Sequence, residues 1–212
     1  MTTPPPNLLG LLPSDLVSHL ESVGVACSLT EARRVLSRVI SDGDENPAPR
    51  REPRKVLVNA LREHTTWNRL EVLERVPDSE GKSVRYLFRS PDGALSEAVR
   101  IGLHKPDHFT VCLSSQVGCA MQCAFCATGR LGLTRNLAPW EIVSAFMIVR
   151  DEAPGRVSGA VFMGQGCLST LPLWMVAPPG LPASRSGAAG SALPQAVPLP
   201  QGFLGEPPRP LC

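Results

Sequence analysis

Hydrophobic positions recur at helical spacing in the first part of the chain. Ser14 can cap a helix that ends near Val23, and Thr30 can cap a second helix whose apolar residues return every three or four positions. Residues 42–55 are polar, charged and interrupted by prolines, which predicts a linker. The pattern therefore predicts an N-terminal helical accessory domain and linker over residues 1–55.

The pattern changes to strand-like alternation after a third predicted helix over residues 56–64. Residues 83–88 and 95–101 alternate apolar and polar side chains, and they flank the turn-forming sequence Ser-Pro-Asp-Gly at 90–93. These two strands predict a β-hairpin. We expect residues 56–108, helix and hairpin together, to lead into the core of the protein.

A strand, a helix and a second strand follow and predict one βαβ unit. Residues 109–113 and 157–163 have the composition of buried strands, and residues 139–149 that of an amphipathic helix with proline in its first turn. The fold class expected is α/β, with residues 109–167 as the first part of a (βα) barrel. Residues 168–212 are rich in proline, glycine and alanine, which predicts an irregular, disordered tail.

Composition and charge narrow the class of protein. A formal net charge of +2 is too small to indicate a nucleic-acid-binding protein by itself. No apolar stretch reaches the roughly 18 to 20 residues that cross a bilayer, and residues 1–6 lack the features of a signal peptide. We therefore expect a cytoplasmic protein without a membrane partner. In that compartment the 7 cysteines favour metal binding or catalysis over a disulfide scaffold.

A C-x3-C-x2-C motif lies between the first strand and the helix of the βαβ unit, at Cys119, Cys123 and Cys126. Three thiolates can hold three irons of a [4Fe-4S] cluster and leave the fourth iron without a protein ligand. The amino and carboxylate groups of S-adenosylmethionine (SAM) can chelate this open iron. One electron can then cleave a carbon–sulfur bond of SAM and release a 5′-deoxyadenosyl radical. The motif thus predicts a radical SAM site with a [4Fe-4S] cluster, SAM and an external electron donor.

Three nearby residues are candidates for binding SAM. Phe125 precedes the last cysteine of the motif and can pack against the adenine ring, and Gly164 and Gly166 can let backbone approach the amino-acid end. The alternatives are a structural zinc site, in which the same cysteines bind with His104 or His108, and buried cysteines without a metal.

The central part of the chain resembles the RlmN/Cfr family of radical SAM RNA methyltransferases in the run VCLSSQVGCAMQCAFCATG at residues 111–129. Residues 135–142 and 161–164 extend the match, which covers roughly residues 56–166. Family members methylate carbon 2 of an adenine in 23S ribosomal RNA, and many also modify transfer RNA. The resemblance implies an enzyme with a partial barrel of the radical SAM type. It also implies a monomer whose partners are these RNAs.

The resemblance also implies roles for two residues outside the motif. In the family, one SAM methylates a cysteine near the C-terminus, and a second SAM supplies the radical that activates this methyl group for transfer to adenine. A second cysteine then forms a disulfide that releases the product, and Cys112 matches that resolving cysteine. Glu97 matches a hairpin glutamate proposed as proton acceptor. Considered without the resemblance, Cys112 is a small hydrophobic residue of a buried strand and Glu97 is an exposed strand residue. For each residue a catalytic role and a purely structural role therefore stay open.

The match stops after Gly166. There the family continues with a glutamate and a proline that help to bind SAM, whereas residues 167–170 of this chain are Cys-Leu-Ser-Thr. Cys212 does not match the context of the methyl-carrying cysteine. We therefore expect a truncated or frame-shifted chain that is inactive as a methyltransferase. A non-catalytic RNA-binding fragment is the second hypothesis, and a zinc-binding module is the third.

Overall fold

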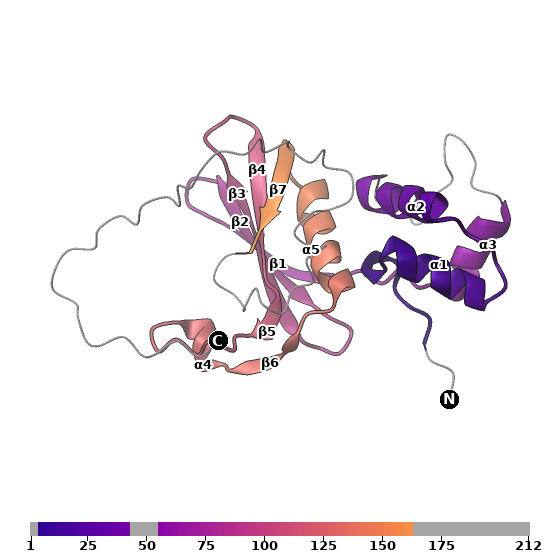
Figure 1. Cartoon of the computed structure of the whole chain (residues 1–212). Helices are drawn as coiled ribbons and strands as arrows, with labels where there is room; N and C mark the ends of the chain where they lie inside the picture. The colour runs from indigo at the N-terminus through magenta and orange to yellow at the C-terminus, as the bar shows by residue number, and fades with distance from the viewer. Residues whose placement is uncertain (1–3, 43–54, 163–212) are drawn as a thin grey trace, which may run out of the picture. The chain divides into compact units, whose positions relative to one another are not determined.

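The computed structural model describes residues 4–42 and 55–162 (Figure 1). In chain order the elements are η1 (Leu8–Gly10), α1 (Pro13–Ser22), α2 (Leu29–Asp42), α3 (Lys55–His64), β1 (Glu71–Pro77), β2 (Ser83–Arg89), β3 (Leu95–Gly102), β4 (His108–Leu113), β5 (Gln116–Gly118), α4 (Ala127–Arg130), β6 (Leu133–Asn136), α5 (Pro139–Asp151) and β7 (Arg156–Val161). The predicted tail at 168–212 lies outside the described residues, as do Gly164 and Gly166. The predicted domain boundaries stay predictions. None of the described helices is long and apolar enough to cross a membrane.

The three N-terminal helices form where the sequence predicts them, but their caps differ. Ser28 and Glu31 make a reciprocal capping box, in which the Ser28 hydroxyl accepts from the Glu31 backbone N–H at 3.3 Å and the Glu31 carboxylate accepts from the Ser28 backbone N–H at 2.9 Å. The first helix begins at Pro13, whose missing N–H costs nothing at this position. Ser14 and Thr30 lie inside the first turns, so the predictions that they cap the helices were wrong.

A five-stranded sheet in the order β1-β2-β3-β4-β7 forms the second part of the described structure (Figure 1). The predicted hairpin is β2 and β3, and its turn at residues 90–93 closes with a 2.9 Å hydrogen bond from the Gly93 N–H to the Ser90 carbonyl. The predicted βαβ unit is β4, α5 and β7, in which the two strands pair in parallel.

Two strands at the sides of this sheet differ from the sequence expectation. The sequence did not predict β1, which is mostly exposed, carries charged residues and has a bulge between Val72 and Glu74. Residues 157–163 were predicted to be a buried strand, but β7 alternates exposed and partly buried positions. In the described part of the chain β7 pairs with β4 alone, so its other edge has no covering strand and the prediction of burial was wrong.

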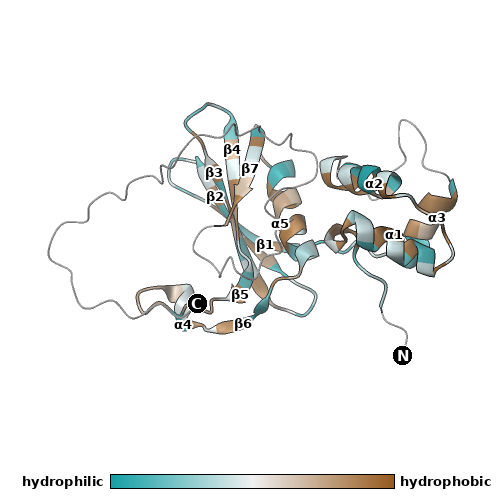
Figure 2. Cartoon of the chain, in the orientation of Figure 1, coloured by the Kyte–Doolittle hydropathy of each residue, from teal (hydrophilic) through white to brown (hydrophobic). Residues whose placement is uncertain are grey.

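The helix α5 is apolar on more than one face. Ile142 and Val149 pack with the sheet residues Phe88 and Val111, whereas Met147 packs among the buried residues of the N-terminal helices. Hydrophobic residues extend along most of α5 in Figure 2. A helix with apolar side chains all round is stable only when other elements cover it. The helix α5 therefore contributes to both hydrophobic cores.

Met147 tests this double role, because its side chain is fully buried at 0% exposure. Met147→Ala should lower the free energy of unfolding by about 2 to 5 kcal/mol, since it removes buried methylene and sulfur contacts and leaves a cavity. Urea denaturation measures the loss. The control Leu95→Ala removes a side chain that is 48% exposed and should cost less than about 1 kcal/mol. Equal losses in the two variants would contradict the placement of Met147 in the core.

Candidate functional site

The predicted cluster cysteines lie in one long connection, residues 119–132, which we call the cysteine loop. The short strands β5 and β6 pair antiparallel at its base (Figure 1). The Cys119 backbone N–H donates to the Gly132 carbonyl at 2.9 Å, directly beside this pairing. Gly118 has a φ of +76°, and a Cβ there would stand 1.9 Å from the Gly132 oxygen. A side chain at position 118 would therefore prevent the two ends of the loop from crossing this closely.

Two of the cysteines lie at opposite ends of one tight turn. The Cys126 backbone N–H donates to the Cys123 carbonyl at 3.0 Å, and such a turn keeps its end Cα atoms within about 7 Å of each other. Gly129 packs against this turn, because a Cβ there would lie 2.9 Å from the Cys123 nitrogen. Cys119 is buried, Cys123 and Cys126 are partly buried, and no disulfide joins any two cysteines of the described residues.

The chemistry of this ligand set fits an iron–sulfur cluster better than zinc. Three thiolates are soft ligands that suit iron–sulfur clusters, whereas a structural zinc site takes four ligands. Within residues 4–42 and 55–162, no group of three or more His, Cys, Asp or Glu side chains is arranged to hold a metal ion. The structure therefore places the three cysteines on one loop without gathering their thiols, and it adds neither His104 nor His108 as a further ligand. The cluster ligands stay a prediction.

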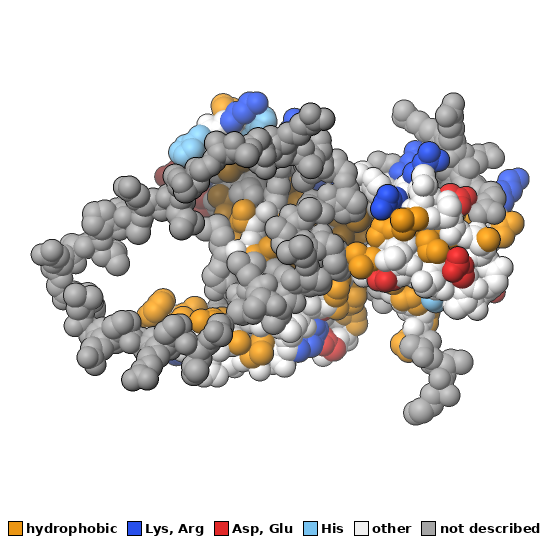
Figure 3. All heavy atoms as spheres, viewed as in Figure 1, with side chains coloured by type: hydrophobic (Ala, Val, Ile, Leu, Met, Phe, Trp, Pro, Cys, Tyr) orange, Lys and Arg blue, Asp and Glu red, His pale blue; other side chains and the backbone are white. Residues whose placement is uncertain are grey.

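Apolar side chains project from the cysteine loop. Phe125 is 89% exposed, and Met121 and Leu131 are also exposed. Figure 3 shows hydrophobic side chains gathered on the surface near α4 and β6. An exposed aromatic ring beside a candidate cluster ligand can pack against a planar group such as adenine. The predicted contact between Phe125 and SAM is compatible with this position and stays a prediction.

Glu97 and Cys112 lie on the same face of the sheet. Cys112 on β4 stands directly opposite Val99 on β3, which is two residues from Glu97. Paired residues of antiparallel strands share a face, alternate residues of one strand share it too, and such diagonal neighbours lie about 7 to 8 Å apart. Ala98 and Val111 belong to the other face, which packs against α5. The structure thus brings the two predicted catalytic residues together on the face away from α5.

The Glu97 side chain is accessible and has a cationic neighbour. It is 33% exposed, and one carboxylate oxygen lies 3.4 Å from the Arg85 guanidinium. Its backbone carbonyl accepts a 2.7 Å hydrogen bond from the Ser114 hydroxyl, which joins the ends of β3 and β4. An accessible carboxylate on a rigid strand is suited to accept a proton from a ligand bound over this face.

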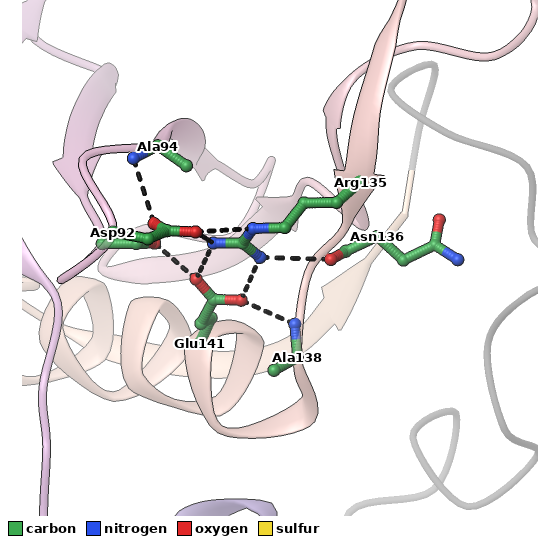
Figure 4. A network of polar contacts seen from close by, with 7 residues as sticks. Asp92, Ala94, Arg135, Asn136, Ala138 and Glu141 are labelled. Carbon is green, nitrogen blue, oxygen red and sulfur yellow. Dashed lines mark hydrogen bonds and ion pairs between the residues drawn. The ribbon is translucent and has the colours of Figure 1, made fainter.

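A polar network at the base of the cysteine loop was not predicted from the sequence (Figure 4). Arg135 on β6 donates two parallel hydrogen bonds to the Glu141 carboxylate of α5, at 2.7 and 2.9 Å, and a third to Asp92 at 2.8 Å. Glu141 is 1% exposed and also accepts from the Ser90 hydroxyl and, at 2.6 Å, from the Ala138 backbone N–H. The network therefore joins β6, the first turn of α5 and the β2–β3 turn.

Comparison with known proteins identifies the relatives of this chain. No family model matches it. A probable RNA methyltransferase of Sorangium cellulosum is 43% identical over 157 residues, which are 69% of this chain and 39% of that protein. A probable dual-specificity RNA methyltransferase RlmN of Synechococcus is 47% identical over 98 residues, which are 46% of this chain and 27% of that protein. The crystal structure of a radical SAM methyltransferase from Sphaerobacter thermophilus matches with a TM-score of 0.60 at 32% identity, over 76% of this chain and 47% of that chain.

Over the matched residues this chain is similar to RlmN-like RNA methyltransferases. This result confirms the family that residues 111–129 predicted, and the structural match agrees with the predicted α/β class. The chain spans 39% of the length of the Sorangium relative and 47% of the Sphaerobacter chain. The activity, substrates and partners of the whole protein are therefore taken up as proposals.

In this RlmN-like chain the polar network holds its groups in their charged forms. Burial by itself would raise the pKa of Glu141, but hydrogen bonds from Arg135, Ser90 and Ala138 outweigh it and hold that pKa below its ordinary value. The hydrogen bonds with Glu141 in turn raise the pKa of Arg135. The backbone N–H of Ala94, together with Arg135, lowers the pKa of Asp92. The buried contact between Arg135 and Glu141 is therefore an ion pair at neutral pH.

One sequence signal could have found part of this network. Glu141 lies three residues after Ala138, the residue before the predicted helix start at Pro139, and glutamate at that position often accepts from the cap N–H. No local pattern links Arg135 to a turn some 40 residues earlier, because that contact depends on how the strands are placed in three dimensions.

The pH dependence of stability tests the charge on Glu141. Because its pKa is lower in the folded chain, the carboxylate contributes stability that is present above about pH 4.5, its ordinary value, and is lost as the pH falls below that. At pH 7, Glu141→Gln should lower the free energy of unfolding by about 2 to 3 kcal/mol, since it breaks a largely buried ion pair. We expect the difference from wild type to shrink steadily below about pH 4.5 in urea titrations.

A matched variant separates this effect from general acid destabilisation. Glu74→Gln changes an exposed glutamate on β1 and should stay within about 0.5 kcal/mol of wild type at neutral pH. A wild-type advantage over Glu141→Gln that persists unchanged at low pH would show that the Glu141 charge is not its source.

Proposed function

We propose that this chain carries the cluster-binding part of a radical SAM enzyme that methylates carbon 2 of an adenine in 23S ribosomal RNA and in transfer RNA. One observation carries the proposal: the three-cysteine loop comes after the carboxyl end of β4. Cys112 lies on β4, and Glu97 lies on the same sheet face of the neighbouring strand β3. Ligand sites of parallel α/β structures are usually built at the carboxyl ends of strands. The relatives are an RNA methyltransferase and a dual-specificity RNA methyltransferase, which supports RNA as the substrate.

The residues of this chain divide the proposed work between loop and sheet. Cys119, Cys123 and Cys126 would hold a [4Fe-4S] cluster through their thiolates, and Phe125 would pack against the adenine of SAM. When bound, a cluster with one open iron supplies the electron, received from an external donor, that reductively cleaves SAM. The proposed SAM-binding residues Gly164 and Gly166 lie outside the described residues.

Radical chemistry is required because adenine carbon 2 is a poor nucleophile and cannot attack the methyl group of SAM directly. Glu97 would take the proton from this carbon after the methyl group is added, and Cys112 would form the disulfide with the methyl-carrying cysteine that releases the product. Both groups project from paired strands rather than from a loop, which holds them in a fixed relation. The sheet face would therefore be the place where the adenine is presented.

Reconstitution with iron and sulfide under anaerobic conditions tests the ligand set. The chain should bind about four iron and four sulfide per molecule, with broad visible absorption and an electron paramagnetic resonance signal after reduction. Alanine at Cys119, Cys123 or Cys126 should abolish both signals. The control Cys112→Ala removes a thiol outside the loop and should keep the cluster. A colourless chain that binds zinc through the same three cysteines would refute the proposal in favour of the zinc hypothesis.

Turnover by the 212-residue chain is a separate question. We propose that the loaded chain forms no 2-methyladenine with SAM, a reductant and a 23S RNA fragment, because residues 167–170 replace the Glu-Pro pair that the family uses to bind SAM. Mass spectrometry of digested RNA measures the product. Detection of 2-methyladenine that depends on Cys112 would refute the expected inactivity and support the catalytic roles of the sheet face.

A further inference from the structure

We propose that Arg135 is a positioning residue that fixes the base of the cysteine loop against α5 and the β2–β3 turn. The effect of Arg135 on a bound cluster rests on the proposed function. The anchoring of the loop does not, because it is a property of the metal-free protein. Its basis is the place of Arg135 on β6, directly opposite Val117 on β5 and close to the first cysteine of the loop.

The cysteine loop extends from a hairpin that is not part of the large sheet. The strands β5 and β6 form a separate two-stranded sheet. A two-stranded hairpin by itself is at best marginally stable in water. The backbone hydrogen bond from Cys119 to Gly132 lies within this hairpin and cannot attach it to the core. The orientation of the loop must therefore come from contacts outside the β5–β6 pair.

Side chains at the hairpin base supply those contacts. Arg135 donates to Glu141 and Asp92, which belong to α5 and to the β2–β3 turn. A second set of hydrogen bonds runs from the Gln116 amide to Asn136 at 2.9 Å and from the Ala120 backbone N–H to Gln116 at 3.3 Å. The second set stays inside the hairpin and its loop, whereas Arg135 links the hairpin to α5 and to the β2–β3 turn. Val117 of β5 adds an apolar contact with the core of the large sheet.

The guanidinium shape explains why arginine is needed at this position. Its planar fork donates in parallel to both oxygens of Glu141 while its Nε reaches Asp92, and its Nη1 also donates to the Asn136 carbonyl at 3.1 Å. Lysine carries the same charge on a compact ammonium that cannot span two carboxylates in this geometry. A lysine should therefore keep part of the attraction to the buried Glu141 and lose the fixed orientation.

Amide hydrogen exchange measured by mass spectrometry on the metal-free, full-length chain tests the proposal. In Arg135→Gln the amides of residues 116–136 should exchange at least about tenfold faster, whereas those of β2 and β3 stay as in wild type. Arg135→Lys should fall between wild type and Arg135→Gln. Asp92→Asn, which weakens only the exposed part of the network, provides a milder variant that should also show loop-selective acceleration.

The matched control is Arg75→Gln. Arg75 makes a similar two-pronged contact with Glu152 at the end of α5, at 2.6 and 2.7 Å, far along the helix from Glu141. This variant should leave exchange in residues 116–136 unchanged. Equal acceleration in the loop and in β2–β3, or no acceleration of the loop in either Arg135→Gln or Asp92→Asn, would overturn the positioning role.

A second readout separates this proposal from the proposed function. If wild type binds a cluster, iron-loaded Arg135→Gln should give a broadened paramagnetic signal. It should also lose its iron to a chelator faster than wild type and Arg75→Gln do. An unaltered signal and unaltered loss would contradict a positioning effect on the ligands. If wild type binds no cluster, the proposed function fails, while the exchange result still decides whether Arg135 anchors the loop.

Discussion

The buried carboxylate of Glu141 is the constraint on which the arrangement of the candidate site depends. A carboxylate at 1% exposure is strongly unfavourable unless charged and polar groups compensate for the water it has lost. Here the compensation comes from Arg135, Ser90 and Ala138, which belong to three different segments of the chain. Satisfying one buried charge therefore requires the β2–β3 turn, the end of β6 and the start of α5 to meet at one point.

The packing of α5 gives this polar contact a fixed frame. The helix fills the face of the sheet that carries Phe88 and Val111, and with Met147 it also reaches the core of the N-terminal helices. Apolar burial is strong but not directional, and it could tolerate small rotations of the helix. The two parallel hydrogen bonds between Arg135 and Glu141 are directional and select one orientation. Hydrophobic packing thus provides the stability of the arrangement, and the ion pair its orientation.

Elements that depend on interactions between residues close in the sequence were predicted correctly more often than contacts between residues far apart in the sequence. The β2–β3 hairpin and the βαβ unit were predictable because alternation, turn residues and helical spacing are local patterns. The strands β5 and β6 are three and four residues long, too short for any periodicity to show. The helix caps were misplaced because several neighbouring polar residues can cap, and only the geometry shows that Ser28 does so instead of Thr30.

For the candidate site, the sequence predicted residues, whereas the structure shows how some of them are placed relative to one another. The cysteine spacing and the run around it pointed to the loop and to Cys112, and the comparisons confirmed the family. That Glu97 and Cys112 share a face follows from the register of β3 and β4, and register cannot be read from either strand alone. The Arg135 contact to Asp92 was invisible for the same reason, since it joins residues whose neighbourhood is created by the sheet.

Shape and orientation of the cysteine loop have separate physical causes. Its shape depends on backbone sterics, because a side chain at Gly118 or Gly129 would collide with backbone atoms of the loop itself. Its orientation depends on Arg135, which contacts residues outside the loop. The proposed ligand set of three thiolates would depend on both, since the loop would have to bring its cysteines together and also hold a constant orientation relative to the large sheet. Changes at the glycines and at Arg135 should therefore impair the site in different ways, the first through the ligands themselves and the second through where they point.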